Sequence, residues 1–256
     1  MSENKIKFYL NDKKVEALQD ETIWQVANRL GTEIPHLCYA NKPGYRADGN
    51  CRACMVEIEG ERVLAASCIR KPTNEMKVNT SSEKAKKSRE LVFELLLSDQ
   101  PERDISHDND SKFWNWIDKV EVKESRFPKK TPCQSDTSHP SMAVNLDACI
   151  QCNLCVRACR EVQVNDVIGM AYRGENSKIV FDFDDPMGDS TCVACGECVQ
   201  ACPTGALMPS SVVDKDGVGH SHVDKKVNSV CPYCGVGCQI EYNVKDNKIK
   251  YVNGID

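Results

Sequence analysis

Sixteen cysteines in 256 residues constrain this chain more than any other feature. The start, Met1 to Lys7, is polar, and no apolar segment of a secretory signal follows it. Disulfides form in oxidising compartments and are rare in the cytosol. We therefore expect a cytoplasmic protein whose cysteines are reduced thiols, available to bind metal.

Two cysteine runs repeat one spacing, C-x2-C-x2-C-x3-C, over residues 149–159 and 192–202, and Pro203 follows the second run. This spacing is typical of bacterial ferredoxins with two [4Fe–4S] clusters, in which the fourth cysteine of each run ligates the other cluster. The pattern assigns one cluster to Cys149, Cys152, Cys155 and Cys202. It assigns the second to Cys192, Cys195, Cys198 and Cys159. Arg160 occupies a place where proline often sits, which does not affect ligation. The repeat predicts a module with pseudo-twofold symmetry over 141–212.

Four further cysteines lie in the N-terminal 80 residues, with the spacing C-x12-C-x2-C-x13-C. This differs from the plant-type C-x4-C-x2-C spacing. The long first gap resembles the [2Fe–2S] domain that opens the large iron–sulfur subunit of respiratory complex I and of iron hydrogenases. The predicted ligands are Cys38, Cys51, Cys54 and Cys68. Zinc is the alternative for this set and for the double run, because four-cysteine zinc sites also use C-x2-C pairs.

The pattern around these four cysteines indicates a β-grasp ferredoxin domain over residues 1–80. Residues 5–10 alternate as a strand, Asn11 and Asp12 form a turn, and residues 15–18 return. Thr22 is placed to cap a helix that runs through Leu30, with Gly31 as its stop. Further strands are expected at 55–58 and 62–66.

Residues 81–140 are expected to be a helix and a linker. A helix is predicted over 82–97, with Lys84 to Arg89 on its solvated face and an apolar side of Leu91, Val92 and Leu95. Residues 98–140 are polar and suggest a linker with one short helix, which Trp114 and Trp116 anchor on a neighbouring domain. A connector over 213–228 follows the ferredoxin module.

A third cysteine motif, C-P-Y-C-G-V-G-C, opens the last segment, residues 229–256, and an alternating hairpin at 239–244 and 248–252 follows it. Its two glycines would let the backbone pass close to a cluster. The motif resembles the start of molybdopterin-dependent oxidoreductases, where a fourth cysteine further along the chain completes a [4Fe–4S] site. That resemblance makes three residues an incomplete ligand set for a third such cluster: Cys231, Cys234 and Cys238.

The expected α+β chain consists, in order, of a β-grasp [2Fe–2S] ferredoxin domain, a linker, a two-cluster bacterial ferredoxin module and the start of a molybdopterin oxidoreductase [4Fe–4S] domain. This order resembles the alpha subunit of cytoplasmic NAD-dependent formate dehydrogenase. The stretch from Asp147 to Gly174 is especially similar. The resemblance covers the front part of a much longer subunit, so we expect a fragment or a truncated product.

The resemblance implies an enzyme whose catalytic residues lie outside this span. Formate would be oxidised at a bis-molybdopterin guanine dinucleotide with molybdenum or tungsten, present only in the full-length family. Electrons would pass through the Cys231 to Cys238 cluster, then the two ferredoxin clusters, then the [2Fe–2S] centre. The implied partners are a flavin-containing, NAD-reducing subunit or a ferredoxin, and the rest of the catalytic domain.

Relatives commonly carry one more [4Fe–4S] site, of sequence H-x3-C-x2-C-x5-C, between the first two cluster domains. Aligned from Leu95, its positions fall on Gln100, Asp104, His107 and Phe113, so that cluster is expected to be absent.

Two other functions remain open. One is a stand-alone multi-cluster electron carrier, which the incomplete Cys231 motif disfavours. The other is the corresponding iron–sulfur part of complex I or of an iron hydrogenase.

Several other residues invite a functional interpretation that the sequence does not support. Cys133, with His139 six residues on, is interpreted as a loop thiol, since nothing specifies the electropositive site of a reactive cysteine. His36 is expected to pack against its loop, and His220 and His222 to be exposed.

Charge and hydropathy exclude other classes of function. The net charge of −5 argues against a nucleic-acid partner, which needs a surplus of Lys and Arg on one face. No run approaches the roughly 18 apolar residues that span a bilayer, so no membrane association is expected.

Overall fold

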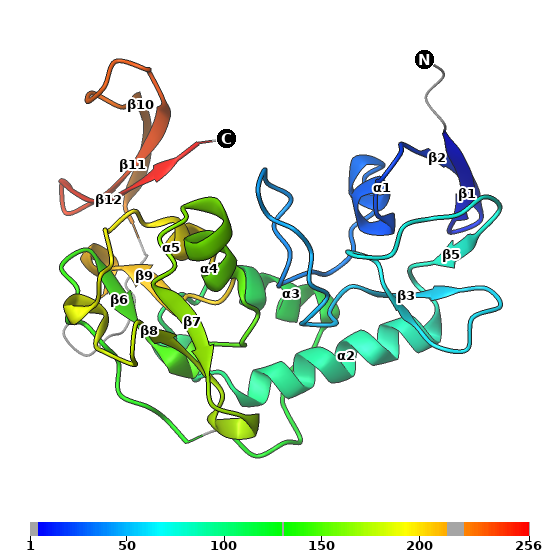
Figure 1. Cartoon of the computed structure of the whole chain (residues 1–256), viewed down its shortest axis with the longest axis horizontal. Helices are drawn as coiled ribbons and strands as arrows, with labels where there is room; N and C mark the ends of the chain where they lie inside the picture. The colour runs from blue at the N-terminus through cyan, green and yellow to red at the C-terminus, as the bar shows by residue number, and fades with distance from the viewer. Residues whose placement is uncertain (1–4, 130, 214–222, 256) are drawn as a thin grey trace.

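The computed structural model describes residues 5–129, 131–213 and 223–255. A long helix, α2 (Glu83–Ser98), runs between an N-terminal sheet unit and a cysteine-rich unit at its far end. The last strands form a separate small sheet beside the cysteine-rich unit (Figure 1). The secondary structure is mixed helix and strand, as expected for the α+β class.

The N-terminal unit is a five-stranded sheet with the strand order β2-β1-β5-β3-β4. The strands are β1 (Ile6–Leu10), β2 (Lys13–Ala17), β3 (Met55–Ile58), β4 (Ala65–Ala66) and β5 (Lys77–Asn79). Strands β1 and β5 are parallel, and the other pairs are antiparallel. The predicted turn is confirmed: Asn11 and Asp12 have φ of 50° and 64°, the left-handed pair that a two-residue hairpin turn requires. The strand expected at 62–66 is only two residues long.

Helix α1 (Ile23–Arg29) covers this sheet and begins where the sequence predicts. The Thr22 hydroxyl accepts a hydrogen bond from the Gln25 amide, and the Gln25 side chain accepts one from the Thr22 amide. This reciprocal capping satisfies two amides that the first turn leaves without a partner. The helix buries Ile23, Trp24, Val26 and Ala27 in the core of the unit.

Helix α2 has the predicted length but not the predicted face. Leu91 and Leu95 are 39% and 53% exposed, whereas Phe93 and Arg89 are buried. The Arg89 guanidinium donates to the carbonyls of Met55, at 2.9 Å, and of Thr80. The predicted solvated face is therefore wrong at Arg89, and the predicted apolar side is wrong at Leu91 and Leu95, because these hydrogen bonds and the Phe93 contact set the rotation of the helix.

The segment expected to be a linker does carry a short aromatic helix, α3 (Lys112–Val120), after a single turn, η1 (Arg103–Ile105). Trp114 is buried, and Phe113 lies 6.2 Å from Phe93 between ring centroids. Helix α3 thus anchors the segment around it in the interior of the molecule through Phe113, Trp114 and Ile117.

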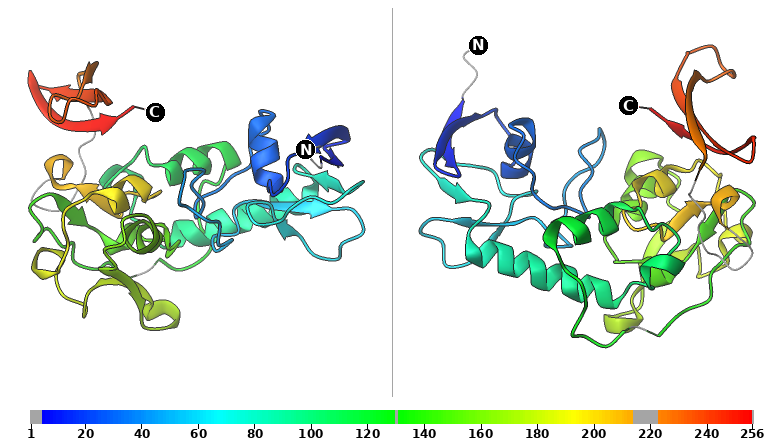
Figure 2. Two further views of the ribbon diagram at one scale, coloured as in Figure 1. Left: turned by 45° about the horizontal axis from the view of Figure 1, so that its top comes forward. Right: turned by 180° about the vertical axis from the view of Figure 1, so that it is seen from behind.

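The cysteine-rich unit consists of two small antiparallel ladders and two short helices (Figure 2). Strand β6 (Met142–Val144) pairs with β9 (Leu207–Pro209), and β7 (Ile168–Ala171) pairs with β8 (Lys178–Phe181). Helix α4 (Leu154–Arg157) continues into a π-helical turn, η3 (Ala158–Val162), and α5 (Glu197–Ala201) is its counterpart in the second run. Single turns complete the unit: η2 (Leu146–Ala148), η4 (Gly174–Asn176), η5 (Met187–Asp189) and η6 (Ser210–Val212).

The last segment forms a three-stranded antiparallel sheet in the order β10-β11-β12. Strands β11 (Gln239–Lys245) and β12 (Lys248–Gly254) are the predicted hairpin. Strand β10 (Lys225–Val230) was not predicted and lies partly in the expected connector. His220 and His222 lie outside the described residues.

Two apolar cores stabilise the chain. The first holds the β-grasp interior, including Phe8, Ile23 and Val56. The second is shared between units: Leu37 and Cys38 of the N-terminal unit pack in one cluster with Phe113 of α3 and Leu207 of the cysteine-rich unit. The N-terminal cysteine loop is therefore part of the core that carries the double cysteine run.

Candidate iron–sulfur sites

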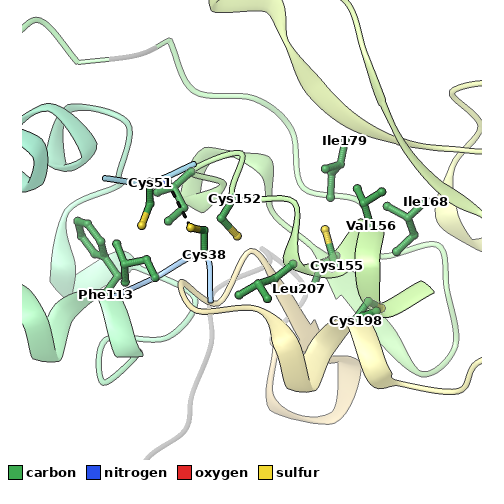
Figure 3. Close-up of a cluster of buried hydrophobic side chains, with 14 of the residues drawn as sticks. Cys38, Cys51, Phe113, Cys152, Cys155, Val156, Ile168, Ile179, Cys198 and Leu207 are labelled. Carbon is green, nitrogen blue, oxygen red and sulfur yellow. Dashed lines mark hydrogen bonds between the residues drawn. The ribbon is translucent and has the colours of Figure 1, made fainter. Parts of the chain in front are cut away.

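The four N-terminal cysteines come together on the face of the sheet unit that meets the rest of the protein. Cys38 follows α1, Cys51 and Cys54 precede β3, and Cys68 follows β4. All four are buried, none more than 9% exposed. The Cys38 thiol interacts with those of Cys51 and Cys68, and Cys68 also with Cys54. The Cys51 amide lies 3.4 Å from the Cys38 sulfur (Figure 3).

These contacts favour the thiolate form at two of the four cysteines and, through the same hydrogen bonds, raise the pKa of the two donors, Cys51 and Cys68. Hydrogen bonds from the Cys51 and Cys68 thiols lower the pKa of Cys38, and one from Cys68 lowers that of Cys54. The donor set is entirely sulfur and enclosed, with an amide aimed at one sulfur. Such a set fits a cluster, whose potential is adjusted by burial and by hydrogen bonds to sulfur.

The internal repeat of the double run is visible in the backbone. Gln151 and Asn153 have φ of 55° and 61°, and their counterparts Ala194 and Gly196 have 57° and 76°. In each loop, the second left-handed residue, Asn153 or Gly196, directly precedes a short helix, α4 or α5. The two loops therefore share one backbone shape around their closely spaced cysteines.

The fourth cysteine of each run lies near a thiol of the other run, and Cys202 also lies near Cys198 of its own run. Burial and the charges of Cys202, Cys149 and Cys38 raise the pKa of Cys152. In the second group, burial and then the charges of Cys192, Cys195 and Cys159 raise the pKa of Cys198, to about 12. Cys202 is thus a neighbour of the first loop, and Cys159 of the second.

Polar hydrogens point at several of these sulfurs. The Val167 amide lies 3.3 Å from the Cys159 sulfur, and the Ala194 amide 3.4 Å from that of Cys192. The Asn165 side-chain amide lies 3.8 Å from the exposed Cys195. These donors fit anionic sulfur ligands and would stabilise the charge of a bound cluster.

The N-terminal site and the first loop of the double run are adjacent. Cys38 and Cys51 lie beside Cys152 in Figure 3, and the Cys38 charge acts on Cys152. Arg157, 2% exposed, joins the two loops: one of its terminal nitrogens (Nη2) donates to the Cys38 carbonyl at 2.7 Å and to the Cys152 carbonyl at 3.3 Å. Its Nε pairs with Asp48 at 3.1 Å. Sequence reasoning missed Arg157, although its place between Cys155 and Cys159 was a signal.

The third motif lies at the open end of the C-terminal sheet. The Cys231 amide donates to the Cys238 carbonyl at 2.9 Å, which closes the loop between β10 and β11. Gly235 and Gly237 adopt φ of 75° and 82°, a left-handed backbone that glycine adopts without strain. Cys234 and Cys238 are exposed, and Cys231 is half-buried.

The segment that lacks the additional cluster motif is packed in other ways. Gln100 is buried and donates to the Ala148 carbonyl at 3.0 Å, and His107 and Phe113 are also buried. Asp104 is exposed. Three of the four positions aligned with the additional cluster motif therefore contribute to the interior.

The other candidate residues lie where a structural role predicts them. The His36 ring packs 4.3 Å from Trp24 between ring centroids, and burial lowers the pKa of His36 to about 4. Cys133 is exposed on its loop. His139 is buried and accepts a hydrogen bond from the Ser141 amide at 3.1 Å.

In residues 5–129, 131–213 and 223–255, no three His, Cys, Asp or Glu side chains converge as tightly as a single metal ion needs. Within the same ranges, no helix has the length and apolar character to cross a membrane.

Family models match three parts of the chain in the expected order. A 2Fe-2S iron-sulfur cluster binding domain matches residues 3–83, and a 4Fe-4S dicluster domain matches residues 148–206. A molybdopterin oxidoreductase Fe4S4 domain matches residues 224–256. The predicted fold class is confirmed.

Curated relatives are similar over most of this chain. A subunit of the NADH-quinone oxidoreductase of Rhizobium meliloti is 30% identical over 96% of the chain. A subunit of the NADP-reducing hydrogenase of Solidesulfovibrio fructosivorans is 32% identical over 78%. A Staphylococcus haemolyticus protein, to which formate dehydrogenase activity is provisionally assigned, is 27% identical over 85%. The matches cover 29%, 35% and 26% of these relatives, so the chain spans about a third of their length or less.

A solved structure shows the same architecture. A chain of an NAD+-reducing NiFe hydrogenase, in the H2-reduced state, superposes with a TM-score of 0.73 and 26% identity. The match covers 80% of this chain and 87% of that chain. These findings relate the chain to the iron–sulfur portions of complex I-like molybdopterin oxidoreductases and hydrogenases.

Proposed function

We propose that this chain, related to the complex I-like molybdopterin oxidoreductases, is the electron-conducting part of a formate dehydrogenase alpha subunit. The observation that carries the proposal is the adjacency of the thiols around Cys38 to the first loop of the double cysteine run, in one shared core. When bound, the clusters supply one-electron carriers between a molybdopterin site outside this chain and a flavin-containing partner that reduces NAD.

The proposed ligand sets follow the proximity of the thiols. The N-terminal set is proposed to hold a [2Fe–2S] cluster, and it consists of Cys38, Cys51, Cys54 and Cys68. The crossed sets are proposed to hold two [4Fe–4S] clusters, the first bound by Cys149, Cys152, Cys155 and Cys202 and the second by Cys192, Cys195, Cys198 and Cys159. The neighbour relations of Cys152 and Cys198 support the crossing. Three thiols of a further [4Fe–4S] site are proposed at Cys231, Cys234 and Cys238.

In this span the protein itself contributes enclosure, spacing and hydrogen bonds. Amides aimed at Cys38, Cys159 and Cys192 stabilise negative charge on sulfur. Arg157 holds two cysteine loops together. Electron transfer depends on fixed distances between clusters, and these contacts hold the cysteine loops in place. The proposed location is the cytoplasm.

A complex I-type subunit is the second candidate. The similarity to the NADH-quinone oxidoreductase subunit of Rhizobium meliloti extends over 96% of the chain, more than the 85% for the Staphylococcus relative. Formate specificity is tested with the subunit in its natural length, assembled with its partners. Reduction of the clusters by formate is expected, whereas H2 alone should leave them oxidised. Clusters that NADH reduces and formate does not would favour the complex I-type role.

The cluster content is tested on anaerobically purified protein by iron, acid-labile sulfide and zinc analysis together with EPR after dithionite reduction. About ten irons per chain, from one [2Fe–2S] and two [4Fe–4S] clusters, are expected, and about fourteen if the Cys231 site is also filled. Stoichiometric zinc with little iron would refute the electron-transfer function.

Single substitutions separate the proposed sites. Cys54→Ser should remove the [2Fe–2S] signal and leave both [4Fe–4S] signals. Cys133→Ser is the matched control, because Cys133 lies outside every cysteine run, and it should change none of them. Loss of a [4Fe–4S] signal in Cys54→Ser alone would contradict the ligand assignment.

A further inference from the structure

Lys112 occupies an unfavourable position for a cation. It is the first residue of α3, directly after the Ser111 cap. The amino end of a helix carries partial positive charge, so a lysine there is disfavoured. The side chain is also half-buried, and burial lowers the pKa of its ammonium to about 8. A residue that opposes both local preferences calls for a reason elsewhere in the structure.

The surroundings of Lys112 are the thiols of two different sites. The charges of Cys51, Cys152 and Cys38 act on it in the direction that keeps it protonated, against burial. His36, whose pKa is lowered by burial and then by the charge of Lys112, is a further titratable group beside it. The geometry agrees, because the Lys112 ammonium approaches the carbonyl of Tyr39, the residue after Cys38, and Lys112 lines one cavity with Leu154 and Cys202, so it lies between the two sites.

Hydrogen bonding alone does not explain this placement. The Lys112 ammonium approaches the Tyr39 carbonyl at 3.5 Å, a long contact. Within the described residues, no salt bridge joins Lys112 to a carboxylate. Lys119 of the same helix contrasts with it, because Lys119 is exposed and pairs with Glu33 at 2.8 Å.

Lys112 also borders a cavity of about 300 Å³ between the two units. Tyr39 and Tyr45 line the cavity from the N-terminal unit, and Glu197 and Cys202 line it from the cysteine-rich unit. The Glu197 carboxylate already accepts a hydrogen bond from the Tyr45 hydroxyl at 2.7 Å. The charge of Lys112 is thus left to act on the sulfur sites on either side.

We propose that Lys112 is a positioning charge that raises the reduction potentials of the [2Fe–2S] cluster and of the [4Fe–4S] cluster bound by Cys149, Cys152, Cys155 and Cys202. The inference rests on the cluster assignment of the proposed function. A reduced cluster carries one more negative charge than an oxidised one, so a nearby cation in a poorly solvated place stabilises the reduced form. One lysine between two sites shifts both potentials in the same direction. The difference between the two reduction potentials therefore changes little, while both clusters become easier to reduce.

The test is an EPR-monitored redox titration of the anaerobically purified chain. Lys112→Met keeps the length of the side chain and removes the charge. For each of the two clusters, we expect the equilibrium between oxidised and reduced forms to shift about tenfold toward the oxidised form. This shift corresponds to a fall in reduction potential of about 59 mV for a one-electron couple. The cluster assigned to Cys192, Cys195, Cys198 and Cys159 should keep its potential, because none of its proposed ligands is among the thiols that act on Lys112.

Two variants control the experiment. Lys112→Arg retains the charge and should hold both potentials near the wild-type values, which a purely structural role for the side chain would not predict. Lys119→Met makes the same chemical change on the same helix, at an exposed residue, and should shift neither cluster. If Lys112→Met is purified without its full iron content, Lys112→Gln is measured in its place.

The outcomes distinguish this inference from the proposed function. Wild-type protein without iron–sulfur clusters would refute the function. Fully loaded Lys112→Met and Lys112→Gln with both potentials within twofold of wild type would refute the role of Lys112 and leave the function intact. Equal shifts in all clusters, or in Lys112→Arg, would also refute it, because they would show a general rearrangement.

Discussion

Arg157 offers the sharpest test of how the two cluster-bearing units are held together. Its guanidinium is buried between the loops of Cys38 and Cys152, donates to both carbonyls and pairs with Asp48 at 3.1 Å. Arg157→Met keeps most of the side-chain volume and removes the hydrogen bonds and the charge. The Asp48 carboxylate, whose side chain is 14% exposed, would lose its buried partner.

The expected cost is large because the remaining groups stay buried. Removing one member of a buried ion pair typically destabilises a protein by about 3–5 kcal/mol. Unpaired buried carbonyls add to this cost, and the exposed Arg46, which also contacts Asp48, offsets part of it. We therefore use about 3 kcal/mol, a factor of roughly 10² in the folding equilibrium.

The assay is the rate at which the visible iron–sulfur absorbance disappears in guanidinium under anaerobic conditions. Cluster loss is irreversible, so a rate is the appropriate measure of stability. If the Arg157 contacts break before the rate-limiting step, loss should be at least about tenfold faster in Arg157→Met. Arg157→Lys should be intermediate, since an ammonium keeps the charge but lacks the planar fork that reaches several carbonyls.

Arg46→Met is the matched control, because Arg46 contacts the same carboxylate from a largely exposed position. An exposed pair of this kind contributes no more than about 1 kcal/mol. A rate for Arg157→Met within threefold of wild type, or equal to that of Arg46→Met, would refute the idea that a buried guanidinium joins the two units.

Two further predictions concern the same junction. Phe113→Ala removes a fully buried ring that packs against Phe93 and should destabilise the protein by about 3–5 kcal/mol, measured as faster cluster loss; a variant as resistant as wild type would show that α3 is not part of the core. Tyr45→Phe deletes the 2.7 Å hydrogen bond to Glu197 and should cost about 1.5–3 kcal/mol, whereas Tyr172→Phe, which deletes an exposed hydrogen bond to Asp184, should leave the rate nearly unchanged. Equal effects of the two tyrosine substitutions would contradict the role of the Tyr45–Glu197 hydrogen bond in stabilising the contact between the two units.

The cysteine pattern and the local caps could be predicted from the sequence alone. The spacing of a C-x2-C-x2-C-x3-C run restricts its local geometry, because the short gaps confine three thiols to one tight loop. The Thr22 capping box and the Asn11 turn follow equally local rules, and the structure shows both. These features involve residues within a few positions of each other, so no information from the rest of the fold is needed.

The burial of helices α2 and α3 depended on tertiary structure. Residues 91–97 of α2 are nearly all apolar, apart from Glu94, so their pattern allows more than one buried face. Hydrogen bonds from Arg89 to Met55 and Thr80, and the contact of Phe93 with Phe113, decide the rotation. Met55 lies 34 residues from Arg89 along the chain, beyond the reach of a helical pattern.

The charges between the sites were also set by tertiary structure. Arg157 and Lys112 appear in the sequence as one residue of a cysteine run and one of a polar segment. Their importance arises because the chain brings the Cys38 loop to the Cys152 loop, 114 positions apart by residue number, with both cations beside them. The sequence by itself determined which cysteines have the local spacing of cluster ligands. Only the tertiary structure decided which sites are neighbours and which buried charges lie between them, because both depend on packing between distant segments.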